Sequence, residues 1–268
     1  METEIVDAAI VISNTIIAKG YGAALTGAGI SKESGIPTFR DKDGLWSKFK
    51  PEEFATPEAL FKHPKKVWEW YKGRYFDVLK AKPNKGHLAL AELGSLLKLF
   101  FVITQNIDRL HQRAGSRNVI ELHGNLFQAK CVDCGTIYPM DEAVKQDKMP
   151  PKCKRCGGML RPNVVLFGEP LPEDALDTAI EMASRSYFFL VIGTSALVYP
   201  AASLPLIAKR NASVIIEVNP EPTPVTEIAD ISIRGKAGEI LPKLVHEVKK
   251  LLKEDLEENE EENKKEDE

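Results

Sequence analysis

The sequence lacks long hydrophobic runs and a basic amino-terminal segment, and it contains few cysteines. The longest apolar runs, Leu99–Ile103 and Tyr187–Ile192, fall far short of the roughly 20 residues that cross a bilayer. The chain opens on Met1-Glu-Thr-Glu, which is acidic, whereas a cleavable signal begins with a basic region. Only four cysteines occur in 268 residues, and a chain of this length can bury a core without disulfides. We therefore expect a cytoplasmic protein that makes no contact with membranes.

The composition is that of an ordinary globular protein, but its charge is unevenly distributed. Apolar residues make up 43% and charged residues 28%, which excludes disordered, collagen-like and coiled-coil chains. The length allows one large domain or two modest ones. Residues 254–268 hold ten acids and two lysines, a net charge of −8, within a chain whose net charge is −3. The rest of the chain is therefore mildly basic, at +5.

Short apolar runs alternate with amphipathic stretches along most of the chain. Short runs of this kind are typical of buried strands, and apolar residues at helical spacing are typical of helices. The alternation predicts an α/β fold with a parallel sheet covered by helices on both faces. The expected strands are residues 22–26, 99–104, 119–122, 187–193, 213–218 and 231–233. The expected helices are residues 4–19, 87–98, 172–184, 200–209 and 238–253.

Two segments break this alternation and divide the chain. Residues 31–85 show no clear buried strand, and residues 124–165 hold all four cysteines. We interpret them as a helical module and a cysteine module that together form a small domain at the edge of the sheet. The sheet domain then consists of residues 1–30, 86–123 and 166–253. Residues 254–268 lack apolar anchors past Leu256, so we expect a frayed helix end that passes into disorder.

The cysteines form two pairs, Cys131 with Cys134 and Cys153 with Cys156, in a C-x2-C-x18-C-x2-C pattern. Four thiolates at this spacing fit tetrahedral zinc and leave no open position, which predicts a structural metal. The alternatives are two disulfides or four free thiols, and an intracellular location disfavours the first. A nucleic-acid-binding ribbon is disfavoured as well, because residues 130–161 carry a net charge of only +3.

A glycine-rich turn, Gly27-Ala28-Gly29-Ile30-Ser31, follows the first expected strand. Small residues at such a turn let backbone N–H groups approach a pyrophosphate. Lys32 stands where the G-x-G-x-x-G pattern has its third glycine, so a nucleotide site and a simple tight turn both remain open. Arg40 could pair with a phosphate, or it could be an ordinary exposed arginine.

Two further polar features follow expected strands. The run Gln105-Asn106-Ile107-Asp108 comes directly after residues 99–104, where a parallel sheet binds ligands, although Asn106 or Asp108 could also cap a helix. His123 follows residues 119–122, and a histidine with a near-neutral pKa is a natural general base. For His63, His87, His111 and His246 we favour structural roles. No G-x-S-x-G elbow or Walker lysine is present, which disfavours a hydrolase with its own nucleophile.

The ordered motifs resemble those of the sirtuins, NAD-dependent protein lysine deacylases, across residues 22–240. The matching pieces are Gly27–Ser31, Ser34–Arg40, Thr104–Asp108, Leu110-His111, Glu121–Gly124, the two cysteine pairs, Arg161–Glu169, Gly193–Ser195, Tyr199–Ala201, Asn219 and Gly235–Ala237. The resemblance implies a six-stranded Rossmann-like domain with a small domain of zinc-ribbon and helical modules. It also implies NAD as co-substrate and a structural zinc ion bound by Cys131, Cys134, Cys153 and Cys156.

The resemblance further implies the residues of the site. The NAD-binding set would be Gly27, Ala28, Gly29, Ser31, Phe39, Arg40, Gln105, Asn106, Ile107, Asp108, Gly193, Thr194, Ser195, Asn219 and Ala237. The catalytic residues would be His123, as the base, and Gln105, Asn106 and Asp108. The substrate set would be Tyr71, Arg74, Val165, Phe167, Gly168, Glu169 and Val198. Residues 168–171 and 198–200 would hold an acylated, extended protein segment as an added strand.

The family mechanism would transfer the acyl group to ADP-ribose. The amide oxygen of the acyl-lysine attacks the ribose carbon that carries nicotinamide, and His123 then removes a proton from the ribose 2′-hydroxyl. The products are lysine, nicotinamide and O-acyl-ADP-ribose. Tyr71 and Arg74 resemble the Tyr-x-x-Arg pair of class III sirtuins, which implies that succinyl- and malonyl-lysine are accepted as well as acetyl-lysine. The alternative is a helix surface pair packed against Trp68 and Trp70.

Other functions remain possible on the sequence alone. A protein mono-ADP-ribosyltransferase would use the same NAD pocket, and a non-enzymatic NAD or ADP-ribose sensor would lack a base. The mildly basic body leaves room for partners in chromatin or among other DNA-associated proteins, without sequence-specific nucleic-acid binding.

Overall fold

The centre of the molecule is a six-stranded parallel sheet. A computed structural model describes residues 1–38, 44 and 50–266. The strand order is β3-β2-β1-β7-β8-β9, and every neighbouring pair runs parallel. The strands are β1 (Tyr21–Thr26), β2 (Leu99–Thr104), β3 (Val119–Glu121), β7 (Phe188–Ile192), β8 (Val214–Val218) and β9 (Ile231–Ile233). In chain order this is the 3-2-1-4-5-6 arrangement of the Rossmann fold.

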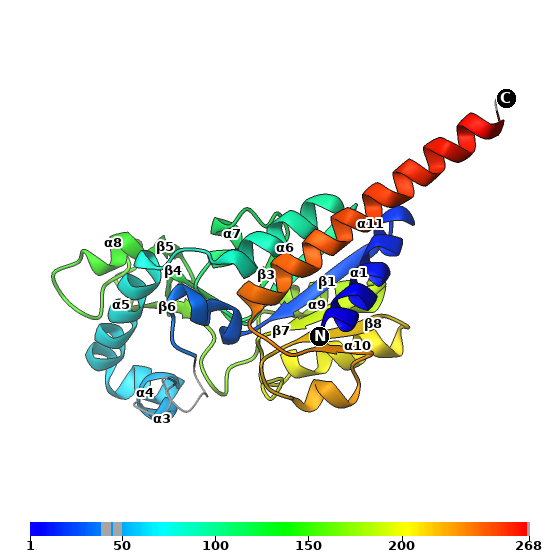
Figure 1. Ribbon diagram of the computed structural model, residues 1–268. Helices are drawn as coiled ribbons and strands as arrows, with labels where there is room; N and C mark the ends of the chain where they lie inside the picture. Colours follow the sequence, from blue (N-terminus) through cyan, green and yellow to red (C-terminus); the bar gives the residue numbers. More distant parts are fainter. Residues whose placement is uncertain (39–43, 45–49, 267–268) are drawn as a thin grey trace.

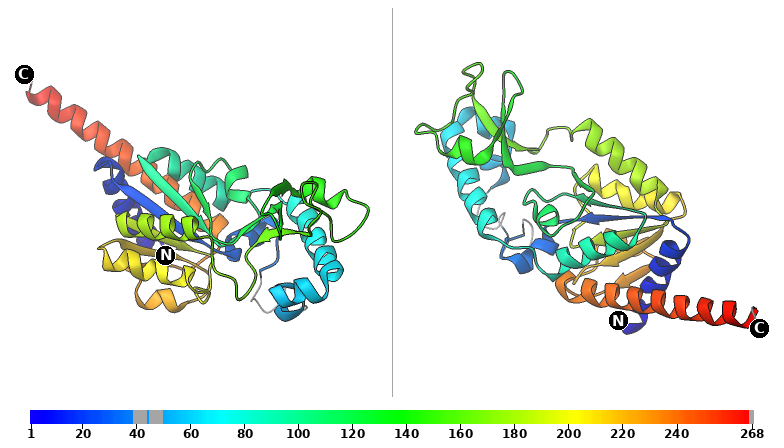
Figure 2. Two further views of the ribbon diagram at one scale, coloured as in Figure 1. Left: turned by 180° about the vertical axis from the view of Figure 1, so that it is seen from behind. Right: turned by 90° about the horizontal axis from the view of Figure 1, so that it is seen from above.

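Helices cover both faces of this sheet, as the view from above in Figure 2 shows. Along β7, Phe188 and Leu190 face one core, and Phe189 and Val191 face the other. This alternation lets a continuously apolar strand be buried on both sides. The first core holds α1 (Glu2–Ile17), α6 (Lys85–Leu96) and α11 (Ala237–Glu266). The second holds α9 (Glu173–Arg185) and α10 (Leu204–Arg210), with the short turn η2 (Ala201–Ser203) before α10.

A second, smaller sheet lies at one end of the molecule (Figure 1). Its order is β5-β4-β6, with antiparallel pairs, and it consists of β4 (Gly124–Cys131), β5 (Ile137–Pro139) and β6 (Leu160–Val164). The helices α5 (Pro64–Lys80) and α8 (Met140–Val144) pack on it, and α3 (Pro51–Phe54) and α4 (Pro57–Lys62) pack on α5. Trp68 of α5 is fully buried against this sheet, and its indole Nε1 donates to the Leu160 oxygen at 2.7 Å.

Most predicted elements are confirmed to within one or two residues, and β2 and β9 match in full. Among the described residues of the segment 31–85 there is no strand, as predicted. The predicted disorder of residues 254–268 is wrong for residues 254–266, which continue α11 as helix. Glu and Lys are strong helix formers, and a helix already docked on the sheet extends without a new nucleation step. Figure 1 shows this last part of α11 extending away from the body of the molecule.

The strand order predicts the point of the sheet at which a ligand would bind. The order of the strands reverses direction between β1 and β7. Ligands of such sheets bind at this point, outside the carboxyl ends of the strands. The chain leaves β1 into η1 (Ala28–Ser34) and leaves β7 at Gly193. Within the part of the chain that the structure describes, none of the helices has the length and apolar character that a bilayer crossing requires.

Candidate functional site

The turns after β1 and β7 are packed directly on each other. The Gly29 N–H donates to the Gly193 oxygen at 2.8 Å, and the Gly27 N–H donates to the Ile192 oxygen at 3.1 Å. A Cβ atom on Gly29 would lie 2.7 Å from the Gly193 oxygen, and one on Gly27 would lie 2.7 Å from Cβ of Thr194. Contact between the two turns therefore requires both glycines, independently of any ligand.

The polar run after β2 lies against this turn and forms a buried cluster with Ser31. The Asn106 amide donates to the Gly27 oxygen at 2.9 Å and to Ser31 Oγ at 3.2 Å, and Ser31 Oγ donates to Asp108 at 2.7 Å. Asp108 also accepts the Leu110 N–H at 2.9 Å, at the start of α7 (Leu110–Arg113). Asp108 therefore both stabilises the start of a helix and joins the cluster, and ligand binding by this run stays a prediction. Burial raises the pKa of the Asp108 carboxyl, and the Ser31 hydrogen bond opposes that rise.

Two histidines that the sequence assigned to structural roles lie directly behind this cluster. Nδ1 of His87 accepts the Asn84 N–H at 3.3 Å, so its Nε2 carries the proton that faces Ser31 Oγ at 3.4 Å. Nε2 of His111 lies 2.9 Å from Oγ1 of Thr26, and the two imidazole rings are 4.9 Å apart. Burial lowers the pKa of His87 to about 4 and holds the pKa of His111 well below 6.5. Both are therefore neutral hydrogen-bonding groups at neutral pH.

His123 lies between β3 and β4, where the two sheets meet. Its Nδ1 is 2.9 Å from the main-chain oxygen of Gln105. Because a carbonyl oxygen only accepts, Nδ1 carries the proton and the lone pair is on Nε2. Burial lowers the pKa of His123, and the bond to Gln105 partly opposes this. The imidazole is therefore neutral at neutral pH, and among the described residues its basic nitrogen Nε2 has no hydrogen-bond partner.

Thr194, directly after β7, is joined to residues that follow β2 and β8. Its Oγ1 accepts from Gln105 Nε2 at 2.9 Å, and its main-chain oxygen accepts from Asn219 Nδ2 at 2.8 Å. Ser195 beside it is exposed, while Ala237 is buried at the start of α11. The predicted NAD residues from three strand ends are thus brought together. Phe39 and Arg40 lie outside the described residues.

The predicted substrate residues after β6 surround an internal ion pair. Arg161 donates to both oxygens of Glu169, at 2.5 and 2.9 Å, and Glu169 also accepts the Leu166 N–H at 2.8 Å. This pair holds the loop in which Phe167 and Gly168 are exposed and Val165 is half-buried. Val198, in the segment after β7, is half-buried as well. The Val165 N–H donates to the His123 oxygen at 2.9 Å, which joins the loop to the histidine.

Tyr71 and Arg74 of α5 differ in their surroundings. Tyr71 is buried, and desolvation raises the pKa of its phenol, with Arg161 and Glu169 close enough to act on it. Arg74 is half-buried and forms an ion pair with Asp77, with Nη2 and Oδ2 2.6 Å apart. The predicted pair therefore lies on one side of the helix, but the Arg74 guanidinium is already bound to an acid of the chain.

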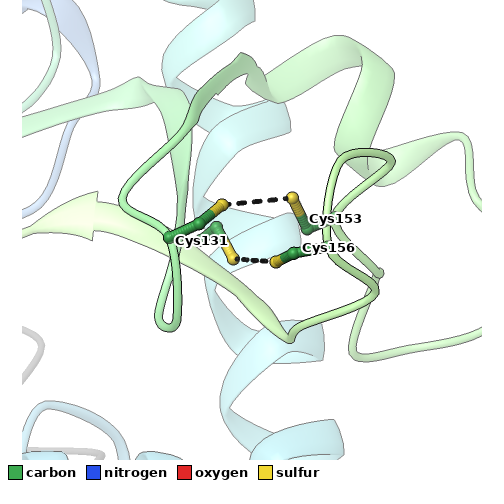
Figure 3. Close-up of side chains that lie close together, drawn as sticks. Cys131, Cys153 and Cys156 are labelled. Atoms are coloured by element: carbon green, nitrogen blue, oxygen red, sulfur yellow. Dashed lines mark hydrogen bonds between the residues drawn. The ribbon is translucent and has the colours of Figure 1, made fainter.

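The four cysteines converge as predicted, from two turns of the small sheet (Figure 3). Their sulfur atoms all lie within 4.8 Å of one another, with Cys131 to Cys156 at 3.5 Å and Cys134 to Cys153 at 3.6 Å. A tetrahedral zinc ion with bonds of about 2.3 Å sets its sulfurs roughly 3.8 Å apart, so the four thiolates fit this metal. Four protein ligands leave no position for a substrate.

The strand order, the turn at its reversal and the polar cluster beside it are those of a dinucleotide-binding α/β fold. A family model described as the Sir2 family matches residues 27–200. The chain is 52% identical to NAD-dependent protein deacylase 2 of Pyrobaculum aerophilum, covering 90% of this chain and 96% of the relative. It is 55% identical to NAD-dependent protein deacylase 1 of Archaeoglobus fulgidus, covering 89% and 97%. The chain belongs to the Sir2 family.

Solved structures agree with this assignment. A complex of a Sir2 homologue with NAD superposes with a TM-score of 0.81 at 55% identity, covering 87% of this chain and 90% of that one. A Sir2 protein bound to a myristoylated histone peptide gives a TM-score of 0.76 at 41% identity, covering 95% and 100%. The predicted fold and family are therefore confirmed.

Proposed function

We propose that this protein removes acyl groups from lysine side chains of proteins and consumes NAD in doing so. The products would be free lysine, nicotinamide and O-acyl-ADP-ribose. Membership of the Sir2 family and the relatives' deacylase names support the reaction class. The single observation that carries it in this chain is the neutral, oriented His123 beside the buried polar cluster at the sheet's reversal point.

NAD fits the crevice between the β1 and β7 turns. Small residues leave the main chain accessible there, and Thr194 fixes the Gln105 amide through its Nε2 so that Oε1 is left to accept from a ligand. The residues proposed to bind NAD are those predicted above, from Gly27 to Ala237. When bound, NAD supplies a ribose carbon that loses nicotinamide readily and can therefore accept the acyl oxygen.

The chain's own residues orient this chemistry and move one proton. Nε2 of His123 would accept a proton from a ribose hydroxyl, because Nδ1 is committed to Gln105. Asn106 and Asp108 would hold the ribose and nicotinamide side of the crevice. Their hydrogen bonds to the η1 turn fix both side chains before a ligand binds, which lowers the cost of ordering them.

The substrate would be an acylated lysine in an extended protein segment. Residues 168–171 and 198–200 would pair with its main chain, and Val165, Phe167 and Val198 would contact the lysine. Glu169 would act through its ion pair with Arg161, which keeps this loop in place. Sir2 proteins have been solved with a p53 peptide and with a myristoylated histone peptide. We include chromatin and other DNA-associated proteins among the candidate partners. The enzyme itself would be cytoplasmic.

We propose acetyl, succinyl and malonyl groups as the acyl chains. Tyr71 and Arg74 would face the end of the chain, where a phenol and a guanidinium bind a carboxylate by charge-assisted hydrogen bonds. The zinc ion would be structural, and it would stabilise a small domain of residues 31–85 and 124–165 against a sheet domain of residues 1–30, 86–123 and 166–253.

The test is an assay of matched acetyl-, succinyl- and malonyl-lysine peptides with and without NAD. The expected result is NAD-dependent loss of the acyl mass, with nicotinamide and O-acyl-ADP-ribose formed in equal amounts. Gain of an ADP-ribose mass on a protein would instead indicate the mono-ADP-ribosyltransferase. Binding of NAD with no turnover of any peptide would indicate a non-enzymatic sensor. Either result would overturn the proposal.

A further inference from the structure

Arg74 occupies a position that ordinarily holds an apolar residue. On α5, Val67, Tyr71 and Val78 are buried, and Arg74 falls on the same side of the helix, three residues after Tyr71. The side chain of Arg74 is only 27% exposed. A guanidinium held this far from water needs a compensating partner, because desolvating a charge is costly.

Asp77 is that partner, and it lies on the solvent side of Arg74. The two residues are three positions apart on α5, with Nη2 and Oδ2 at 2.6 Å, and the Asp77 side chain is 53% exposed. The carboxylate therefore holds the guanidinium at the outer edge of the buried face. Arg161, which acts on the Tyr71 phenol, is likewise paired with a carboxylate of the chain, that of Glu169.

We propose that Asp77 sets the acyl preference of this enzyme by competing for Arg74 with the carboxylate of a dicarboxylic acyl chain. This inference rests on the proposed deacylase function and concerns its substrate class. A succinyl or malonyl group must displace Asp77 before it can pair with Arg74. An acetyl group has no charge, and it leaves the Arg74–Asp77 pair intact. Asp77 therefore lowers activity on acidic acyl chains and leaves activity on acetyl-lysine unaffected.

The competition is weak enough to bias the preference without excluding acidic acyl chains. An ion pair between neighbouring turns of one helix, with one partner exposed as Asp77 is, contributes about 0.2–1 kcal/mol. Removing the competitor is therefore expected to favour the acidic substrate about 1.4- to five-fold.

Asp77→Asn tests this directly, because it removes the charge and keeps the shape at an exposed position where folding tolerates it. The ratio of kcat/KM for succinyl-lysine to that for acetyl-lysine peptides is expected to rise about 1.4- to five-fold. The rise should come from a lower KM for the succinyl peptide. Glu69→Gln is the matched control: it removes another exposed acid from α5, one that lies 4.0 Å from Lys65, and should leave the ratio unchanged.

The effect must also act through Arg74. In an Arg74→Met background, Asp77→Asn should no longer change the ratio. An unchanged ratio in the single variant, an equal rise on both peptides, or a rise that persists without Arg74 would each overturn the inference. Absence of turnover by the wild-type chain would overturn the proposed function instead. In that case, calorimetric titration of the succinyl- and acetyl-lysine peptides into the NAD-saturated protein would test the inference separately. Asp77→Asn should raise the ratio of the two binding constants, succinyl to acetyl, by the same factor.

Discussion

The imidazole of His123 and the main chain of Gln105 are joined by a hydrogen bond of 2.9 Å between Nδ1 and the carbonyl oxygen. Gln105 is the first residue after β2, and His123 follows β3, the neighbouring strand. The parallel pairing of the two strands therefore sets where the histidine stands. It also fixes the tautomer, since the bond leaves the lone pair on Nε2.

Replacing His123 by alanine should remove the base without disturbing the fold. We expect kcat/KM to fall about 10²- to 10⁴-fold, the usual contribution of general base catalysis. His246→Ala is the control, because His246 is exposed on α11. The measurement is nicotinamide release from an acetyl-lysine peptide, with circular dichroism and zinc content to check folding. Near-normal turnover in His123→Ala would contradict the assignment.

The pH dependence of the wild-type enzyme follows from the same residue. The base must be neutral, and burial lowers the pKa of His123 below 6.5. Activity should therefore stay level near neutral pH and fall only as the pH drops through that lowered pKa. The profile of kcat/KM against pH reports this value for the free enzyme. An acid limb with its midpoint above 6.5 would be inconsistent with a neutral, buried base.

His87 should make the stability of the protein depend on pH. Its pKa is about 4 in the folded protein and 6.5 when the side chain is fully solvated, so the unfolded chain binds the proton first as the pH falls. Stability is therefore full above pH 6.5 and is lost between 6.5 and about 4, by about 3 kcal/mol from this residue. In His87→Gln the loss of unfolding free energy between pH 7.5 and 4.5 (measured with urea) should be smaller by about 2.5 kcal/mol, most of the full effect. His246→Gln should behave as wild type, and equal slopes in all three proteins would refute the prediction.

Removal of the metal should unfold the small sheet. The cluster that contains Cys131 and Cys153 also holds Trp68, which is fully buried. Without zinc, four thiolates in contact no longer have a common partner, and structural zinc sites of this kind commonly unfold. We expect one zinc per chain, and a chelator or Cys156→Ser should release it, shift the tryptophan emission to longer wavelength and abolish activity. After chelation of the wild-type protein, Co²⁺, which also accepts tetrahedral thiolate ligands, should restore the emission and the activity. Unchanged emission after complete metal loss would argue against the structural role.

Local patterns in the sequence predicted the strands well and the site only in part. A buried parallel strand is continuously apolar, so Leu99–Thr104 could be recognised residue for residue. The cysteine pairs and the residues after β2 were predictable because metal spacing and strand ends are local signals. The place of His87 behind the polar cluster was not predictable, because its neighbour Ser31 is 56 residues away in the chain. The Arg74–Asp77 pair has ordinary helix-surface spacing, and only the burial of Tyr71 and Val78 distinguishes it.

The close contact between Gly29 and Gly193 leads to a last prediction, a pair of glycine substitutions with opposite effects. In Gly29→Ala the new Cβ would lie 2.7 Å from the Gly193 oxygen and 2.8 Å from its Cα. Since these are main-chain atoms, the two turns must separate, at a cost of about 1–3 kcal/mol. NAD binding should weaken in parallel, because the turns form the crevice. Gly73→Ala meets nothing within 4 Å inside α5 and should instead stabilise the fold by about 0.5–1 kcal/mol, with NAD binding unchanged. Denaturant unfolding measures the change in stability, and calorimetric titration measures the change in NAD binding. If Gly73→Ala destabilised the fold as Gly29→Ala does, the contact between the turns would not be what requires glycine.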